Sequence, residues 1–271
     1  MNDAASSDVG PAPPQAIILA AGKGTRMGAD KPKVVQKVAG RPMIHWVVRA
    51  CQQAGAARCI IVVGYKGEQV REVLGDNRGL AFVEQREQLG TGHAPLMAEP
   101  LFEQVDPCDV LILNGDGPLI RPVTLERILA AHRASGAAET LATSVLQNPY
   151  GYGRILRDAD DQLLAIVEEG DCLPEQKAIK EVNPNYVCVR SDMLFDTLHS
   201  LRRNNAQGEY LLTDMPGILM RLGHQVSLVP AVPPEDVFGI NTPEELKTVD
   251  QILRRRLARE NQCVAASWNE S

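Results

Sequence analysis

The sequence predicts an α/β protein with a mostly parallel central sheet and a smaller β region laid over it as a lid. Short apolar runs typical of buried strands recur along the first half, and stretches with helical periodicity lie between them. Strands joined in this way run parallel through right-handed crossovers. After residue 135 the strand-like stretches follow one another through loops rather than long helices, which predicts the smaller antiparallel or mixed region.

The first predicted strand, residues 17–19, leads into a loop with glycines at 22, 24 and 28. Four cations lie within eleven residues of this loop: Lys23, Arg26, Lys31 and Lys33. A cationic loop rich in backbone N–H groups is suited to hold a triphosphate, although the glycine spacing alone is as typical of a tight β–α turn. The dinucleotide-binding fingerprint and the P-loop are both excluded, because Met27 stands where each motif requires a small residue.

The next elements alternate as this fold class requires. Pro42 and Gly55 are placed to begin and end a helix, and Trp46 is expected in its buried face. Further strands are predicted at 59–64, 80–83 and 110–113, with helices at 67–74 and 124–134. Ligands of parallel sheets bind beyond the carboxyl ends of the strands. The glycine-rich loop and the segments 84–93 and 114–119 are therefore expected to converge there.

The second half contains strand-like stretches at 140–146, 162–167, 181–190 and 225–230. Thr213 or Asp214 is expected to cap a helix that continues through residue 222. Thr242 is the predicted N-cap of a final helix that runs to about residue 259. Four arginines near its predicted end would complement the helix dipole: Arg254, Arg255, Arg256 and Arg259.

Composition excludes several classes of protein. The 271 residues carry a net charge of −6, which argues against a dedicated nucleic-acid binder. Six cysteines without a Cys-x-x-Cys pair indicate free thiols in a reducing compartment. Residues 1–15 lack the basic start and apolar core of a secretory signal and are expected to be a disordered leader. No apolar run approaches membrane-spanning length, so a cytoplasmic protein without a membrane partner is predicted.

Several motifs resemble one enzyme family. The run Leu-Ala-Ala-Gly-x-Gly-Thr-Arg-Met at 19–27, with Pro-Lys at 32–33, is similar to the signature of nucleotide-sugar pyrophosphorylases. The stretches 88–94, 151–155 and 208–214 resemble bacterial N-acetylglucosamine-1-phosphate uridylyltransferases. The resemblance covers roughly residues 16–255. It implies a Rossmann-like fold of the nucleotide-diphospho-sugar transferase type.

The resemblance implies a nucleotide site in the first half of the chain. Its predicted residues are Leu19, Ala20, Ala21, Gly22, Gly24, Thr25, Gln88, Gly90 and Thr91. The side chains of Gln88 and Thr91 can hydrogen-bond the edge of a base and would read uracil. Asp116 ends a predicted strand on a glycine-loosened turn, a position that suits either a turn residue or a ligand of Mg²⁺. The family uses the matching aspartate for Mg²⁺, with Asn241 as the second ligand.

The sugar site implied by the resemblance is less complete. Its predicted residues are Asn114, Gly115, Gly153, Glu168 and Asn183. The sequence departs from the family at Asn114, where an aromatic residue is usual, at Gly117, and at Pro184-Asn185, where the family has small residues. These departures flank the expected sugar pocket. They leave the identity of the sugar open, and the family's N-acetyl recognition is not assumed.

The predicted organisation is a leader at 1–15, a nucleotidyltransferase domain at 16–242, and a C-terminal helix with a frayed tail at 243–271. Within the domain, residues 16–135 form the nucleotide half and residues 136–242 the sugar-binding half. Hexapeptide repeats of a left-handed β-helix are absent from the sequence. Acetyltransferase activity and β-helix trimerisation are therefore not expected, and the oligomeric state is left open.

The predicted reaction joins UTP and a sugar 1-phosphate, with N-acetylglucosamine 1-phosphate as the first choice, and releases pyrophosphate. Arg26 would hold the β,γ-phosphates, Lys33 would reach the α-phosphate and the sugar phosphate, and Mg²⁺ would be the cofactor. One alternative is a related nucleotidyltransferase that uses another sugar phosphate, CTP or the molybdopterin cofactor. The other is a non-catalytic module that binds a nucleotide sugar.

Overall fold

A computed structural model of the chain describes residues 12–24, 31–240 and 242–269. The predicted leader falls mostly outside these ranges, as do Thr25, Arg26 and Asn241. Among the described helices, none is long and apolar enough to cross a membrane.

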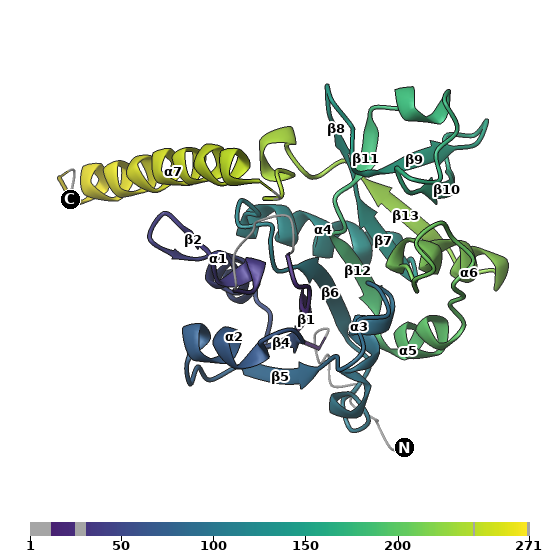
Figure 1. Ribbon diagram of the computed structural model, residues 1–271, viewed down its shortest axis with the longest axis horizontal. Helices are drawn as coiled ribbons and strands as arrows, with labels where there is room; N and C mark the ends of the chain where they lie inside the picture. Colours follow the sequence, from purple (N-terminus) through teal and green to yellow (C-terminus); the bar gives the residue numbers. More distant parts are fainter. Residues whose placement is uncertain (1–11, 25–30, 241, 270–271) are drawn as a thin grey trace, which may run out of the picture.

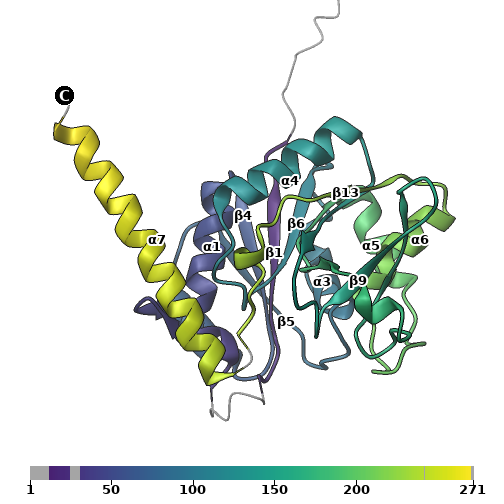
Figure 2. The same ribbon diagram turned by 90° about the horizontal axis from the view of Figure 1, so that it is seen from above.

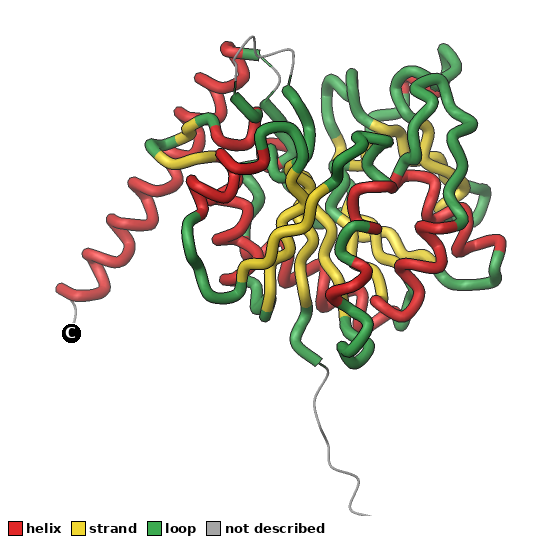
Figure 3. Tube along the Cα trace, turned by 60° about the horizontal axis from the view of Figure 1, so that its bottom comes forward, coloured by secondary structure: helices red, strands yellow, loops and turns green. Residues whose placement is uncertain are grey.

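The central sheet confirms the predicted fold class (Figures 1 and 3). Its seven strands have the order β13-β7-β12-β6-β1-β4-β5. In chain order these strands are β1 (Gln15–Ala20), β4 (Arg58–Val63), β5 (Leu80–Glu84), β6 (Asp109–Asn114), β7 (Glu139–Ala142), β12 (Val187–Arg190) and β13 (Val226–Val229). Every neighbouring pair is parallel except those that involve β12, which runs antiparallel to both β6 and β7.

Helices cover both faces of this sheet (Figure 2). One face packs against α1 (Met43–Gln53), α2 (Gly67–Leu74) and α4 (Pro122–Ser135). The other packs against α3 (His93–Leu96), α5 (Ser191–His199) and α6 (Met215–Arg221). β1 is buried on both sides, as an apolar strand between two helical layers must be. Trp46 is 7% exposed, as its place in the helical pattern predicted.

A smaller antiparallel sheet lies beside the main one and has the order β10-β9-β11-β8. Its strands are β8 (Ser144–Val145), β9 (Gly153–Arg157), β10 (Leu163–Val167) and β11 (Glu181–Asn183). A short hairpin of β2 (Lys37–Val38) and β3 (Arg41–Pro42) precedes α1.

Two stretches that the sequence predicted as single strands are each divided between the two sheets. Residues 140–146 contribute to β7 and then β8, and residues 181–190 contribute to β11 and then β12. Between β11 and β12, Pro184 removes a backbone donor and Asn185 adopts a left-handed φ of 61°. An extended ladder cannot continue through such a turn, so β12 enters the main sheet as an antiparallel strand.

The last helix, α7 (Pro243–Asn269), continues well beyond its predicted end and projects from the body of the molecule (Figures 1 and 2). Its start is as predicted: Thr242 and Glu245 exchange hydrogen bonds of 2.9 and 3.1 Å in a capping box. The expectation that the arginines lie at the helix end is wrong. Arg256 instead reaches the buried carboxylate of Asp236, 2.6 Å away.

Glu139, at the start of β7, is fully buried, and neither of its carboxylate oxygens has a hydrogen-bond partner among the described residues. Burial raises the pKa of this carboxyl well above its usual value. A carboxyl whose pKa is raised on folding stabilises the protein fully below its unfolded-state pKa. That contribution is lost as the pH rises through the folded-state value.

Glu139→Gln is therefore expected to raise the free energy of unfolding by about 1–3 kcal/mol near pH ~8 and to change it little near pH ~4. Urea unfolding of both proteins across this range measures the difference. The exposed Glu126, replaced in the same way, is the control and should show no such pH-dependent gain. If the free energy of unfolding of Glu139→Gln and that of the parent protein change with pH in parallel, burial does not raise the pKa of the Glu139 carboxyl.

Candidate active site

A cavity of about 420 Å³ opens at the carboxyl ends of β1 and β6, where the sequence predicted that its motifs would meet. The predicted residues that line it are Leu19, Ala20, Ala21, Gly22, Gly24, Lys33, Gln88, Gly90, Thr91, Asn114 and Asp116. Val34, Gln85, Ala94 and Glu209 line it as well. Segments separated by up to about 190 residues in sequence thus contribute to one chamber.

One part of the cavity surrounds Lys33. It is called the phosphate end, because the sequence predicts that the glycine-rich loop and Lys33 bind phosphates. The Nζ of Lys33 lies 2.5 Å from Oδ2 of Asp116, and the two side chains are 13% and 31% exposed. The loop can pass close to Lys33 because residue 24 is glycine. Gly24 has a φ of 63°, and a Cβ there would lie 2.6 Å from the Cβ of Lys33. A cation and a carboxylate are therefore held together at one wall of the cavity.

The part of the cavity near Gln88 and Thr91 is called the base end, because the sequence predicts that these two residues bind the base. It also contains Gln85, which the sequence did not predict as a site residue. Gln85 is 3% exposed, and its Nε2 donates to the Gly90 carbonyl at 3.1 Å and lies 3.0 Å from Nδ1 of His93. Gln88 donates to the Gln85 carbonyl at 3.4 Å. The sequence offered one signal for Gln85: it stands two residues after the predicted strand 80–83 and three residues before Gln88.

Two further contacts shape this end. The Oγ1 of Thr91 accepts the Leu212 backbone N–H at 3.1 Å, which leaves its hydroxyl proton available to a ligand. Gly90 has a φ of 117°, and a side chain there would collide with the Tyr210 carbonyl. Glu209, also missed, has its backbone held by two hydrogen bonds with Asn205. Glu209 therefore lines the cavity from a turn that Asn205 holds in place.

The other predicted sugar residues, Gly153, Glu168 and Asn183, belong to the small sheet or directly follow one of its strands, and none of the three is among the residues that line the cavity. Asn183 pairs with Gly153 across β11 and β9, and Oε1 of Glu168 lies 3.6 Å from the position a Gly153 Cβ would take. Thr213 donates to Glu168 at 2.9 Å, and burial raises the pKa of that carboxyl. Thr213 therefore does not cap α6 as predicted, and Asp214 makes no side-chain cap there either.

The donor set at Asp116 is compatible with Mg²⁺. Within the described ranges, no three acidic, histidine or cysteine side chains gather into a site that could hold a metal by themselves. Mg²⁺ in phosphoryl-transfer sites needs only one or two carboxylates, because waters and substrate phosphates complete its shell. The partly exposed Asp116 beside the phosphate end meets that requirement. Gly115, whose N–H donates to the Leu19 carbonyl at 2.8 Å, fixes the backbone beside it.

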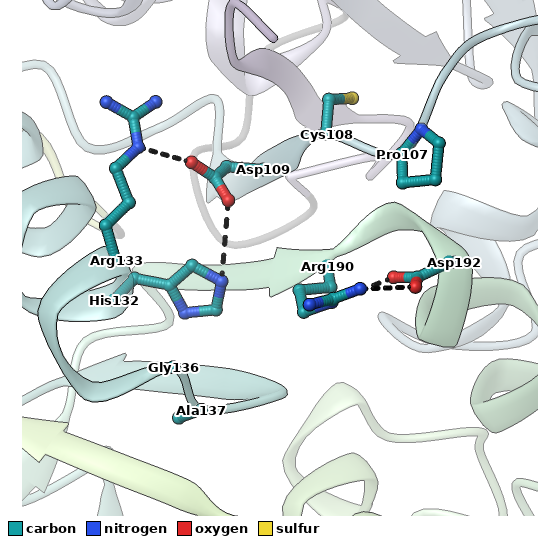
Figure 4. Close-up of a pocket in the computed structure, with 9 residues that line it drawn as sticks. All are labelled: Pro107, Cys108, Asp109, His132, Arg133, Gly136, Ala137, Arg190 and Asp192. Carbon is teal, nitrogen blue, oxygen red and sulfur yellow. Dashed lines mark hydrogen bonds and ion pairs between the residues drawn. The ribbon is translucent and has the colours of Figure 1, made fainter. Parts of the chain in front are cut away.

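A second cavity, of about 310 Å³, lies at the other end of β6 (Figure 4). Asp109 there accepts a hydrogen bond from Arg133 at 2.6 Å and faces His132, and Arg190 pairs with Asp192 at 2.6 Å. Each arginine is thus matched by an aspartate. This cavity lies at the amino end of β6, away from the strand ends where ligands of parallel sheets bind, so the chamber around Lys33 is the candidate active site.

Gly117 packs against a buried tyrosine. A Cβ at position 117 would lie 2.7 Å from Oη of Tyr186 but 3.7 Å from its Cζ. Tyr186 is 3% exposed, and its hydroxyl donates to the Asp236 carbonyl at 3.3 Å. Burial raises the pKa of that hydroxyl, which therefore stays protonated.

Gly117→Ala is expected to lower the free energy of unfolding by about 1–3 kcal/mol, because the buried tyrosine cannot move aside freely. Tyr186→Phe removes the clashing oxygen, so Gly117→Ala in that background should cost less. A double-mutant cycle by urea unfolding measures the coupling. Additive effects of the two substitutions would show that the hydroxyl is not the obstacle.

The fold and this chamber define the chain as a nucleotide-using transferase domain. It belongs to the family of MobA-like NTP transferase domains, which it matches over residues 16–212.

Among curated proteins the chain is similar to several named bifunctional protein GlmU. It is 44% identical to the protein from Geobacter metallireducens over 245 residues. These residues make up 90% of this chain and 51% of that protein. The protein from Pelotomaculum thermopropionicum is 46% identical over 244 residues, 89% of this chain and 52% of its own length. That from Alkaliphilus oremlandii is 44% identical over 247 residues, with 91% and 53% covered. The chain thus spans about half the length of these relatives.

Proposed function

We propose that the protein is a uridylyltransferase that joins UTP and a sugar 1-phosphate to give a UDP-sugar and pyrophosphate. The observation that carries this proposal is the single chamber in which the glycine-rich loop, Lys33 and Asp116 face the polar base end formed by Gln85, Gln88 and Thr91. A nucleoside triphosphate carries a base at one end and phosphates at the other, so one chamber with both kinds of lining can hold it. The similarity to the GlmU proteins supports uracil as the base and N-acetylglucosamine 1-phosphate as the first sugar phosphate to test.

In the proposed reaction an oxygen of the sugar phosphate attacks the α-phosphorus of UTP in line. The bond from the α-phosphorus to the bridging oxygen breaks, and its electron pair leaves with pyrophosphate. Because the attacking oxygen is already an anion, the site requires no strong general base. It must bring two anions together and stabilise the charge on the phosphate oxygens.

Lys33 has the position for that work. Its ammonium group can contact both the α-phosphate and the sugar phosphate from the wall shared with Asp116. Arg26, outside the described residues, is proposed to hold the β,γ-phosphates. The backbone N–H groups around Gly22 and Gly24 would add fixed donors to the same phosphates.

The proposed cofactor is Mg²⁺, held by Asp116 and, as the resemblance implies, by Asn241. When bound it neutralises phosphate charge. Lys33 and Asp116 would then share the substrate phosphates, the former through its ammonium group and the latter through the ion.

The cytoplasm is the proposed compartment. Free thiols at Cys51, Cys59 and Cys188, all buried, agree with a reducing environment.

Pyrophosphate release by the purified protein tests the proposal. Release is expected with UTP, Mg²⁺ and a sugar 1-phosphate together, and not when the sugar phosphate is left out. Replacing UTP by CTP or GTP in the same assay tests the base and separates this proposal from a cytidylyltransferase or a molybdopterin enzyme. Tight binding of UTP without pyrophosphate release for any sugar phosphate would support the non-catalytic module instead.

A further inference from the structure

The positions at which this chain departs from the family lie together in space. Asn114 ends β6, and the last ladder pair between β6 and β12 joins Ile112 to Val187. Two residues beyond that pair the chain reaches Asn114 on one strand and Asn185 on the other. Gly117 meets the hydroxyl of Tyr186 as described above. The departures therefore lie together as one wall at the carboxyl end of β6, and of them Asn114 lines the chamber.

Asn185 and Asn183 form a hydrogen-bonded amide pair in this wall. The backbone N–H of Asn185 donates to Oδ1 of Asn183 at 2.9 Å, and Nδ2 of Asn183 donates to Oδ1 of Asn185 at 3.0 Å. A backbone N–H can only donate, so the facing atom of Asn183 is its oxygen. The amide nitrogen of Asn183 must then face the oxygen of Asn185. This network assigns both amide orientations and turns the NH₂ group of Asn185 away from its partner.

The pair leaves one amide available to a ligand. Asn183, the predicted sugar residue, is 3% exposed, and both of its polar atoms are engaged. Asn185 is only half-buried, and its Nδ2 donates to no other residue in the described part of the chain. Within this pair, the donor that remains for a ligand is therefore the NH₂ of Asn185.

The backbone explains why an asparagine is found there. Asn185 has a φ of 61°, a conformation that only glycine and, next to it, asparagine adopt readily. The buried Pro184 before it stiffens the turn. Glycine would satisfy the same backbone without an amide, so the backbone conformation alone does not require this side chain.

Building on the proposed function, we propose that Asn185 is a specificity-determining residue of the sugar 1-phosphate site and that Asn183 is its positioning residue. The NH₂ group of Asn185 donates a hydrogen bond to an oxygen of the sugar, a hydroxyl or the carbonyl of an acyl substituent. Sugar 1-phosphates that lack an acceptor oxygen at that point are rejected.

Two substitutions separate the parts of this proposal. Asn185→Gly keeps the left-handed backbone and removes the amide. Asn185→Asp keeps an oxygen that can accept from Asn183 and removes the NH₂ donor. The matched control is Asp161→Gly, because Asp161 has the same φ of 61° in the exposed turn between β9 and β10.

The readout is kcat/KM for a panel of sugar 1-phosphates at saturating UTP: glucose, 2-deoxyglucose, glucosamine and N-acetylglucosamine 1-phosphate. Asn185→Gly and Asn185→Asp should both lower kcat/KM for the preferred sugar phosphate about tenfold or more, chiefly by raising its KM. The ratio of kcat/KM for the preferred sugar phosphate to kcat/KM for each of the others should fall as well. The KM for UTP should stay close to that of the parent protein and the control. Asn185→Gly removes the acceptor of the buried Asn183 amide and should lower the melting temperature modestly, whereas Asn185→Asp keeps that acceptor.

Three results with the Asn185 variants would overturn the proposal. Unchanged preference in Asn185→Gly would exclude Asn185, and normal preference in Asn185→Asp would exclude the NH₂ donor. An equal loss for every sugar phosphate and for UTP would mean that the residue only supports the fold. Each leaves the uridylyltransferase function standing, since the parent protein still turns over. A folded parent protein that binds UTP but transfers to none of the sugars would overturn the proposed function and this inference with it.

Discussion

Replacing Lys33 by alanine is expected to lower the rate of UTP- and sugar-dependent pyrophosphate release by about 10²–10³-fold. The Lys33 side chain is 13% exposed and its Nζ lies 2.5 Å from the Asp116 carboxylate, so its charge acts where water is largely excluded. In the proposed reaction the ammonium group stabilises charge that develops on the phosphate oxygens, so its loss is expected to lower kcat more than it raises the KM for UTP. Steady-state kinetics at saturating Mg²⁺ measures the change.

Lys37→Ala is the control for this experiment. Lys37 is exposed in the β2–β3 hairpin only four residues away and carries the same charge, so its loss should leave turnover nearly unchanged. The proteins should unfold at similar urea concentrations. Near-normal turnover in Lys33→Ala would remove this lysine from the mechanism, and an equal loss in both variants would indicate only a general effect of net charge.

Replacing Asp236 by alanine is expected to lower the free energy of unfolding by about 3 kcal/mol. Asp236 is fully buried and lies 2.6 Å from Nε of Arg121 and 2.6 Å from Nη2 of Arg256. Arg256 also donates to the Leu119 carbonyl at 3.0 Å. Removing the carboxylate takes this partner from Arg121 and leaves Arg256 with the exposed Glu235, whose Oε1 lies 3.1 Å from its Nη2. The loss stays at the lower end for a broken buried pair, because Arg121 is 40% exposed and can rehydrate.

The comparison variant is Asp192→Ala, which breaks the exposed pair with Arg190. Those side chains are 35% and 45% exposed, and such pairs contribute about 0–1 kcal/mol. Urea unfolding of both variants gives the two values directly. If Asp236→Ala costs no more than Asp192→Ala, the buried network does not hold α7 against the body.

The parallel sheet and the position of its ligand site follow from local patterns in the sequence. Apolar runs with helices between them define parallel strands, and the glycine-rich loop and Gly115-Asp116 each come directly after one of those strands. Carboxyl ends of parallel strands share an edge, so the chain order of these motifs predicts that they meet. The structure brings them to one chamber for that reason, and the roles assigned to them remain predictions.

Other features depend on contacts that local patterns do not contain. The strand-like stretch 181–190 gives no sign that its second part enters the main sheet between β6 and β7, because that choice depends on a turn at Asn185 and on partners far away in sequence. Gln85 is defined as a lining residue only by its contacts with Gly90 and His93. The same is true of the Asn183–Asn185 pair, whose hydrogen-bond directions are settled by geometry.

The sequence by itself determined the α/β fold class, the glycine-rich cationic loop and the strand-end carboxylate, since each depends on residues a few positions apart. Only the tertiary structure decided that Arg256 belongs to a buried network and not to a helix end. Arg121 and Asp236 in that network are 115 residues apart. The physical reason is that a charged side chain on a helix has many solvated arrangements available. The one it adopts is determined by which buried opposite charge the completed fold places within reach.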